Sequence, residues 1–161
     1  MSMNEHIKEY KQQQEKGIIP KVYRELIGYI MSLSAHFSKK YSNEYAIGSF
    51  YQGYMNVSFF TATPLSLKKQ KLKIAIVFNH EKIRFEIWLS AQNRQIQKKY
   101  WELFKDSDWN KYHIPTSLDG GFSIVDGILV DNPDFNDLES LTIQIEEQAV
   151  SFIRDVADVI G

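Results

Sequence analysis

Two neighbouring stretches near the middle of the chain, 72–78 and 83–89, alternate apolar residues with polar or small ones. Because side chains on a strand point alternately to the two faces of a sheet, each stretch predicts a strand with one strongly apolar face. A four-residue loop, Asn79–Lys82, would join them as an antiparallel hairpin in which Phe78 pairs with Ile83. The opposite face of this hairpin would carry Lys73, Ala75, Val77, Arg84, Glu86 and Trp88.

In chain order, a first strand is predicted over 50–61, before the two strands of the hairpin, and a fourth over 123–130, whose apolar residues indicate burial on both faces. Pro64 ends the earlier strand, because proline cannot donate a hydrogen bond to a neighbouring strand. The more apolar face of that strand would hold Tyr51, Gly53, Met55, Val57 and Phe59, and its other face Gln52, Tyr54, Asn56, Ser58 and Phe60.

Four helices are predicted, chiefly from apolar residues that recur every three or four positions. The first, 4–16, is polar and ends at Gly17, a residue suited to the left-handed conformation that closes a helix. A longer helix begins near Pro20, a third spans 93–105, and the last begins at a capping box, Asn136–Glu139. The order α-α-β-β-β-α-β-α predicts an α+β fold, with an antiparallel meander, a fourth strand after a crossover helix, and helices packed on the sheet.

The length of 161 residues predicts a single domain, 1–161, in which the polar helix within 1–17 is peripheral. The absence of cysteine excludes disulfides, thiolate nucleophiles and cysteine-ligated zinc sites. The chain shows no basic region followed by an apolar run at its start, and no apolar stretch of the ~18 residues that a membrane helix needs. We therefore expect a cytoplasmic protein with no membrane partner.

The net charge of −1 conceals an uneven distribution of charge. Residues 1–100 contain 16 Lys and Arg against 7 Asp and Glu, a net charge of +9, whereas residues 101–161 carry −10. The basic part would either bind an anionic partner or pack beside the acidic part, and we favour the second explanation. The lysines Lys68, Lys69, Lys71 and Lys73 would form either a phosphate-binding patch or a solvated loop whose charges protect the strand against aggregation. Here too we favour the second explanation.

No catalytic, metal-binding or nucleotide-binding motif stands out. The element order resembles that of the restriction-endonuclease-like fold, whose enzymes place an acid on the second strand and Glu-x-Lys on the third. Glu86 lies on the third strand, but Trp88 stands where that motif has lysine, and residues 45–80 contain no Asp or Glu. An active metal nuclease of this type is therefore not expected. No two of the histidines have the spacing of a zinc pair on one helix.

The non-core face of the sheet is the candidate binding site, because small-ligand and peptide sites combine aromatic rings with a few polar groups. The first strand would contribute Gln52, Tyr54 and Asn56, the hairpin Arg84, Glu86 and Trp88, and a lid would be formed by Trp109, Tyr112 and His113. The alternative, favoured by the usual role of aromatic strand residues, is a helix that covers this face and places Trp88 in a second core layer.

These features favour a non-catalytic domain that binds a small molecule or a protein on the sheet face and needs no cofactor. The alternative is an enzyme acting on nucleic acid or a phosphorylated ligand, or a catalytically degenerate restriction-endonuclease-like domain. That alternative rests on the basic half of the chain. Nucleic acid is a less expected partner than a small molecule or a protein. A homo-oligomer that uses the first helix or a sheet edge is a further hypothesis.

Three segments resemble an uncharacterised family of small bacterial proteins, a domain of unknown function. They are Tyr51–Met55, Phe78–Lys82 with its continuation to Trp88 and Leu89, and Ser107–Pro115. The resemblance covers nearly the whole chain. It implies a bacterial, cytoplasmic, stand-alone domain and no particular activity.

Overall fold

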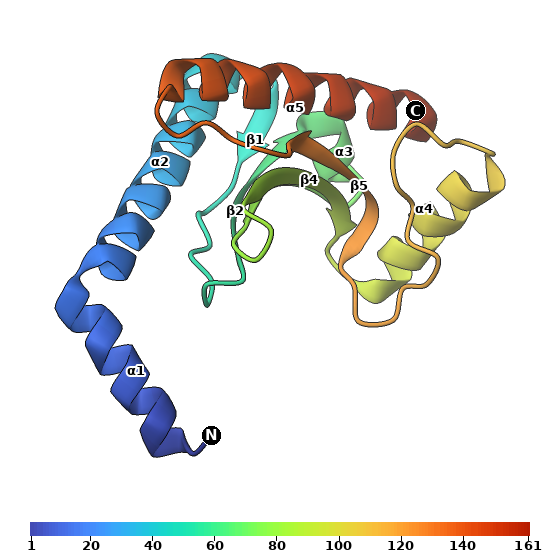
Figure 1. Ribbon diagram of the computed structural model, residues 1–161. Helices are drawn as coiled ribbons and strands as arrows, with labels where there is room; N and C mark the ends of the chain where they lie inside the picture. The colour runs from blue at the N-terminus through green and yellow to red at the C-terminus, as the bar shows by residue number, and fades with distance from the viewer.

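The computed structural model describes residues 1–161. One antiparallel sheet contains five strands in chain order: β1 (Tyr45–Ile47), β2 (Val57–Pro64), β3 (Leu72–Asn79), β4 (Arg84–Ala91) and β5 (Ser123–Val130). The helices are α1 (Met3–Lys16), α2 (Ile18–Tyr41), α3 (Leu65–Lys69), α4 (Arg94–Asp106) and α5 (Leu138–Ile160) (Figure 1). This is an α+β fold, as the sequence predicts.

Helices α2 and α5 pack on one side of the curved sheet, and α4 closes the core beside β4 and β5 (Figure 1). Buried helix residues such as Phe37 and Phe152 meet alternate strand residues such as Ile76 and Ile87 in one hydrophobic core. No helix lies across the other side of the sheet (Figure 1). The structure therefore lacks the covering helix that the sequence allowed, although Ala75, Val77 and Glu86 on that face are buried.

Strands β3 and β4 form the predicted hairpin, but their pairing is shifted by two residues. Phe78 pairs with Phe85, and Ile83 lies in the loop with a φ of 50°. The side-chain oxygen of Asn79 accepts hydrogen bonds from two N–H groups of the loop, which places the turn after Asn79. Because the shift is two residues, each strand side chain keeps its predicted face. The core therefore receives Leu72, Ile74, Ile76, Phe78, Phe85, Ile87 and Leu89.

The strand predicted over 50–61 begins only at Val57, because the residues before it form a loop. Gly53 and Met55 in that loop have positive φ angles of 78° and 65°, which take the chain out of the extended conformation. A Cβ at position 53 would lie 2.0 Å from the Val57 carbonyl oxygen, so the turn requires glycine there. The predicted faces of this strand are wrong. The core receives Ser58, Phe60 and Ala62, and the uncovered side Val57, Phe59 and Thr61.

Two short elements escaped the sequence analysis. β1 lies before the first predicted strand, where no element is predicted, and pairs with β2, with Tyr45 opposite Pro64. α3 contains Lys68 and Lys69, where a loop was expected. Elements of three and five residues are too short to produce a periodic pattern of apolar residues.

The helix ends follow the expected chemistry with one correction. Ser2 and Glu5 form a capping box at the start of α1, and Gly17 separates α1 from α2 in the left-handed conformation. Asp137, and not Asn136, caps α5, because its carboxylate accepts a hydrogen bond from a backbone N–H of the first turn. Helix α1 buries none of its residues and projects from the body of the molecule (Figure 1).

The acidic C-terminal part of the chain packs beside the basic part. Glu146 of α5 binds both His36 and Lys40 of α2, with 2.7 Å between Lys40 Nζ and Glu146 Oε2. Arg84 of β4 lies 3.7 Å from Asp131, which follows β5. These contacts pair part of the positive charge of one half with the negative charge of the other. None of the helices combines the length and the apolar character that a bilayer crossing requires.

Candidate functional site

The uncovered side of the sheet is the candidate site, and we call it the open face. Alternate residues of β2, β3 and β4 form it, and the strand register places them side by side. It comprises Val57, Phe59, Thr61, Lys73, Ala75, Val77, Glu86, Trp88 and Ser90. Three adjoining hollows lie along this face, and they share some of their lining residues.

The central hollow has a volume of about 500 Å³. Ala75 lies in its middle, paired with Thr61 on one side and Trp88 on the other. The methyl group of Ala75 is shorter than the neighbouring side chains, so the sheet surface is depressed at this point. Aromatic rings surround the depression, contributed by Tyr51, Phe59, Trp88 and Phe122. This hollow is the most apolar part of the open face.

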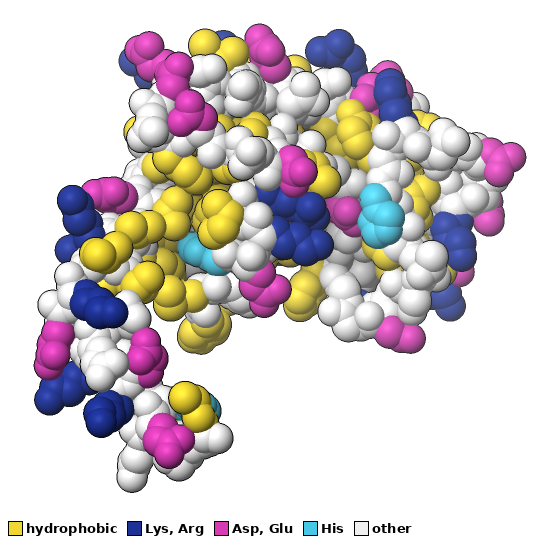
Figure 2. Space-filling view, viewed as in Figure 1, with side chains coloured by type: hydrophobic (Ala, Val, Ile, Leu, Met, Phe, Trp, Pro, Cys, Tyr) yellow, Lys and Arg dark blue, Asp and Glu magenta, His cyan; other side chains and the backbone are white.

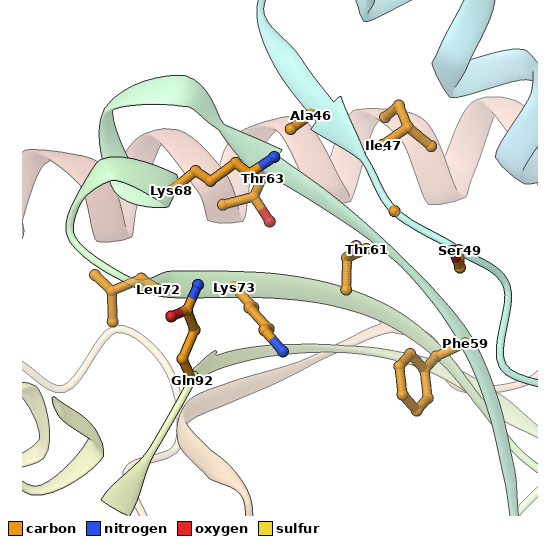
Figure 3. Close-up of a pocket in the computed structure, with 11 residues that line it drawn as sticks. Ala46, Ile47, Ser49, Phe59, Thr61, Thr63, Lys68, Leu72, Lys73 and Gln92 are labelled. Carbon is orange, nitrogen blue, oxygen red and sulfur yellow. The ribbon is translucent and has the colours of Figure 1, made fainter. Parts of the chain in front are cut away.

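The second hollow adjoins the first, and we call it the lysine hollow. Its volume is about 290 Å³, and it shares Phe59, Thr61 and Lys73 with the central hollow. Figure 3 shows Lys68, Lys73 and Gln92 extending from three different parts of the chain around this space. No aspartate or glutamate lines it.

One wall of the lysine hollow is the segment that continues β1. The N–H of Gly48 donates to the Thr61 carbonyl at 2.9 Å, which holds this segment against β2. A Cβ at position 48 would lie 1.9 Å from Thr61 Oγ1, so any other residue there would force the Thr61 side chain to move.

The third hollow lies at the opposite end of the open face, and we call it the acidic hollow. Its volume is about 270 Å³, and it shares Trp88 and Phe122 with the central hollow. Glu86 and Asp126 both line it. The open face therefore has a basic end, an aromatic middle and an acidic end.

The carboxylate of Glu86 holds the ring of Trp88 in place. Only 7% of Glu86 is exposed, and its carboxylate accepts hydrogen bonds from Trp88 Nε1 at 3.0 Å, Arg84 Nε at 2.7 Å and Asn79 Nδ2 at 3.1 Å. The hydrogen bond to Glu86 is the main cause of a rise in the pKa of Arg84, which keeps the guanidinium charged. Because these three donors converge on it, the Glu86 carboxylate orients the side chains of Trp88, Arg84 and Asn79 beside the acidic hollow.

His113 contacts Asp126, one of the residues that line the acidic hollow. Backbone hydrogen bonds join the two residues in both directions, and His113 Nδ1 lies 3.1 Å from each carboxylate oxygen of Asp126. Ser123 Oγ also donates to Asp126, at 3.1 Å. The serine thus binds the acid and not the histidine, an order that does not activate a serine nucleophile.

The other residues proposed for the lid lie elsewhere. Trp109 packs on Phe104 of α4, with 5.0 Å between ring centroids. Tyr112 packs on Phe152 of α5 and donates a hydrogen bond to Asp155 at 2.8 Å. Both rings belong to the helix side of the sheet, so Trp109 and Tyr112 form no lid over the open face.

The three candidates from the first predicted strand lie in the loop before β2. Tyr54 is 88% exposed, and its N–H donates to the side-chain oxygen of Asn56, which lines the central hollow. The carbonyl of Gln52 accepts a hydrogen bond from Ser58, whose hydroxyl also contacts His80 Nε2. Burial lowers the pKa of His80, which favours its neutral form.

Several lining residues were absent from the predicted site. Phe59 was assigned to the wrong face, and Phe122 lies in a loop where no periodicity reveals its direction. Lys73 and Ala75 had been placed on the correct face of the hairpin but were not selected. Continuing the alternation of β4 by one step, from Trp88 to Ser90, would have added Ser90 as well.

A fourth hollow, which is also apolar, lies away from the open face, between α2 and the segment before α5. Its volume is about 710 Å³, and Val22, Leu26, Tyr29, Ile83 and Phe135 line it. Figure 2 shows hydrophobic side chains gathered on this part of the surface, beside α2.

No group of three or more His, Asp or Glu side chains is arranged to hold a metal ion. The chain matches no curated protein and no solved structure. One family model matches it, over residues 3–160, which is nearly its whole length. The chain belongs to the family described as Domain of unknown function (DUF7000).

Proposed function

We propose that this protein is a non-catalytic binding module that holds a small organic molecule on the open face of its sheet. The central hollow carries this proposal. Ligand sites in proteins are concave, mostly apolar and about 300–1,000 Å³ in volume, with a few polar groups that orient the ligand. The central hollow, at about 500 Å³, has this size and composition, and the hollow beside α2 has a suitable size too. We favour the central hollow because four aromatic rings and the polar groups of Asn56, Lys73 and Ser90 line it together.

The polar groups around the hollow support binding more than catalysis. The carboxylate of Glu86 already accepts hydrogen bonds from Trp88, Arg84 and Asn79, and Glu86 does not line the central hollow. Asp126 likewise accepts from Ser123 and contacts His113 Nδ1, and neither Asp126 nor His113 lines the central hollow. General acid–base catalysis needs a group within hydrogen-bond reach of the substrate.

The alternative, a protein that acts on nucleic acid or a phosphorylated ligand, is supported by the lysines beside the hollow and by its aromatic rings. Single strands bind where aromatic side chains stack on bases and basic side chains follow the backbone. However, a strand that ran along the open face would meet Glu86 and Asp126 at the acidic end. This charge distribution favours a small ligand over a polyanion.

Thermal unfolding of the protein in the presence of a broad panel of metabolites tests the proposal. A ligand that binds only the native state raises the melting temperature in proportion to its occupancy. Phe122→Ser should reduce the affinity of any hit about tenfold, because it removes an aromatic wall of the site. Phe122 is 71% exposed, so this substitution should leave stability nearly unchanged.

The matched control is Tyr10→Ser, which removes an exposed aromatic ring from α1, far from the open face. It should leave every ligand-induced shift intact. A hit that Phe122→Ser and Trp88→Phe both leave unaffected would contradict the proposal, since the ligand would then bind elsewhere.

A further inference from the structure

We propose that the ligand is an organic anion with a flat apolar body, whose carboxylate or phosphate group lies in the lysine hollow. This inference rests on the proposed function and specifies the chemical class of the ligand. The body would lie in the central hollow against Phe59 and Trp88, and Lys73, which lines both hollows, would meet the anionic group at their junction.

The residues that line the lysine hollow favour an anion. Lys68 comes from α3, Lys73 from β3 and Gln92 from the residue after β4, so the hollow has donors on several sides (Figure 3). Thr61 adds a hydroxyl group to the same lining. Together these side chains offer two ammonium groups, an amide and a hydroxyl, which suit the several acceptor oxygens of a carboxylate or phosphate.

The charges of the two joined hollows point the same way. Neither the lysine hollow nor the central hollow contains an aspartate or glutamate. The ion pairs within the protein are made by other side chains, so Lys68 and Lys73 have no internal counter-ion. The acids of the open face lie beyond Trp88, at the far end. A neutral ligand would leave both lysines without a partner, whereas an anion would be attracted by both.

The arrangement also sets the order of groups in the ligand. Phe59 and Thr61 of β2 line the lysine and central hollows together, so the two spaces are continuous. A molecule whose anionic group was separated from its apolar body by a long polar linker would not fill both. The structure therefore favours a ligand in which the acid is attached at one end of the ring or chain.

Three probes with one ring system and different end groups test this inference by isothermal titration calorimetry. They are 2-naphthoate, 2-naphthyl phosphate and 2-naphthalenemethanol. At least one of the two anions should bind about fivefold tighter than the alcohol, as expected for ion pairs in a partly exposed site. Comparison of the carboxylate with the phosphate then identifies the acid that the hollow prefers.

Lys68→Gln and Lys73→Gln should each reduce the preference for the anion, with the larger loss for Lys73→Gln, because Lys73 lines both hollows. The matched control is Lys69→Gln, which changes the neighbouring lysine of the same short helix, outside the lining of either hollow. It should keep the preference of the unmodified protein. An equal loss in all three variants would mean a general charge effect and would overturn the inference.

The remaining outcomes separate this inference from the proposed function. Equal binding of all three probes, abolished by Phe122→Ser, would overturn the anion inference and leave the proposed function standing. If none of the probes binds, the inferred ligand class is wrong, and the metabolite panel alone decides the proposed function. A ten-residue oligothymidylate that binds tighter than naphthyl phosphate, with a steep salt dependence, would overturn both in favour of a single-stranded nucleic acid.

Discussion

Among single residues of the open face, Glu86 contributes to stability through the hydrogen bonds that its carboxylate accepts. Its carboxylate accepts from three donors, and removal of its charge leaves those donors without an equally good partner. Glu86→Gln should lower the free energy of unfolding by about 1.5–3 kcal/mol, because the new amide group would face a donor. Urea denaturation measures this change.

Glu81→Gln is the control for Glu86→Gln. Glu81 lies exposed in the loop between β3 and β4, so its replacement should change stability by less than about 0.5 kcal/mol. Equal stability of Glu86→Gln and the unmodified protein would show that the hydrogen bonds around Glu86 contribute nothing net.

The contact between α2 and α5 makes stability depend on pH through Glu146. Burial on its own would raise the pKa of Glu146, but hydrogen bonds and charges from Lys40 and His36 outweigh it and hold that pKa below its ordinary value of 4.5. A carboxylate whose pKa is lowered by folding stabilises the native state above its unfolded pKa. That contribution is lost as the pH falls through the folded value.

Glu146→Gln should therefore be less stable than the unmodified protein near neutral pH, and the difference should shrink as the pH falls below about 4.5. Urea unfolding at about pH 7, pH 5 and pH 3.5 measures the trend. Glu147→Gln, at the exposed neighbouring position, should reproduce the unmodified profile. A difference for Glu146→Gln that stays constant over this range would rule out its ionisation as the cause.

At the scale of elements, α1 is the helix that the fold needs least. It has 14 residues, buries none of them and projects from the body (Figure 1). Isolated helices of this length are only marginally stable in water, so α1 adds little of its own. Deletion of residues 2–16 should change the free energy of unfolding by less than about 0.5 kcal/mol, as measured by urea denaturation.

Sedimentation of the truncated and full-length proteins completes that test. A loss of stability above about 2 kcal/mol would show that α1 supports the core after all. Loss of an oligomer on truncation would show instead that α1 makes the contact between copies, as one of the hypotheses from the sequence held.

The sequence predicts those elements best whose apolar residues form a long periodic pattern. The faces of β3 and β4 follow from alternation alone, and they survive the error in the loop because a shift of two residues preserves the side of each residue. What failed there was the position of Ile83, whose left-handed φ is uncommon for a β-branched residue. Alternation cannot show that a residue leaves the strand just where its pattern still continues.

The candidate site was predictable to the extent that it lies on the hairpin. Glu86 and Trp88 lie on the open face because the period of two assigns them to it. The first strand failed because Gly53 and Met55 turn the chain, which shifts the strand start and exchanges its faces. Phe122 and Tyr51 come from loops, where the direction of a side chain depends on tertiary contacts that no local pattern encodes.

At the scale of the whole molecule, one core joins the helices to the sheet, which leads to the prediction of a single cooperative unit. Phe37, Phe85 and Phe152, from three distant parts of the chain, belong to the same buried cluster. Trp88 lies in β4, Trp101 in α4, and Trp109 packs on Phe104 of α4, so tryptophan fluorescence reports on both regions. Unfolding curves from fluorescence and from far-ultraviolet circular dichroism should coincide, with one midpoint.

Two separate midpoints would contradict that prediction and divide the chain into independent units. The protein without residues 2–16 serves as the control, because α1 lies outside the core and could melt separately. If the fluorescence and circular dichroism curves coincide in the truncated protein but not in the full-length protein, the early transition of the full-length protein belongs to α1.

The one-sided covering of the sheet has a consequence for how relatives of this protein can diverge. On β3, Ile74 and Ile76 fill the core while Lys73 and Ala75, the residues next to them in the chain, form the walls and floor of the hollows. Substitutions at Lys73 or Ser90 can therefore change the lining of the hollows while the packing beneath remains the same. A fold built in this way allows the surface of its open face to vary one residue at a time at little cost in stability.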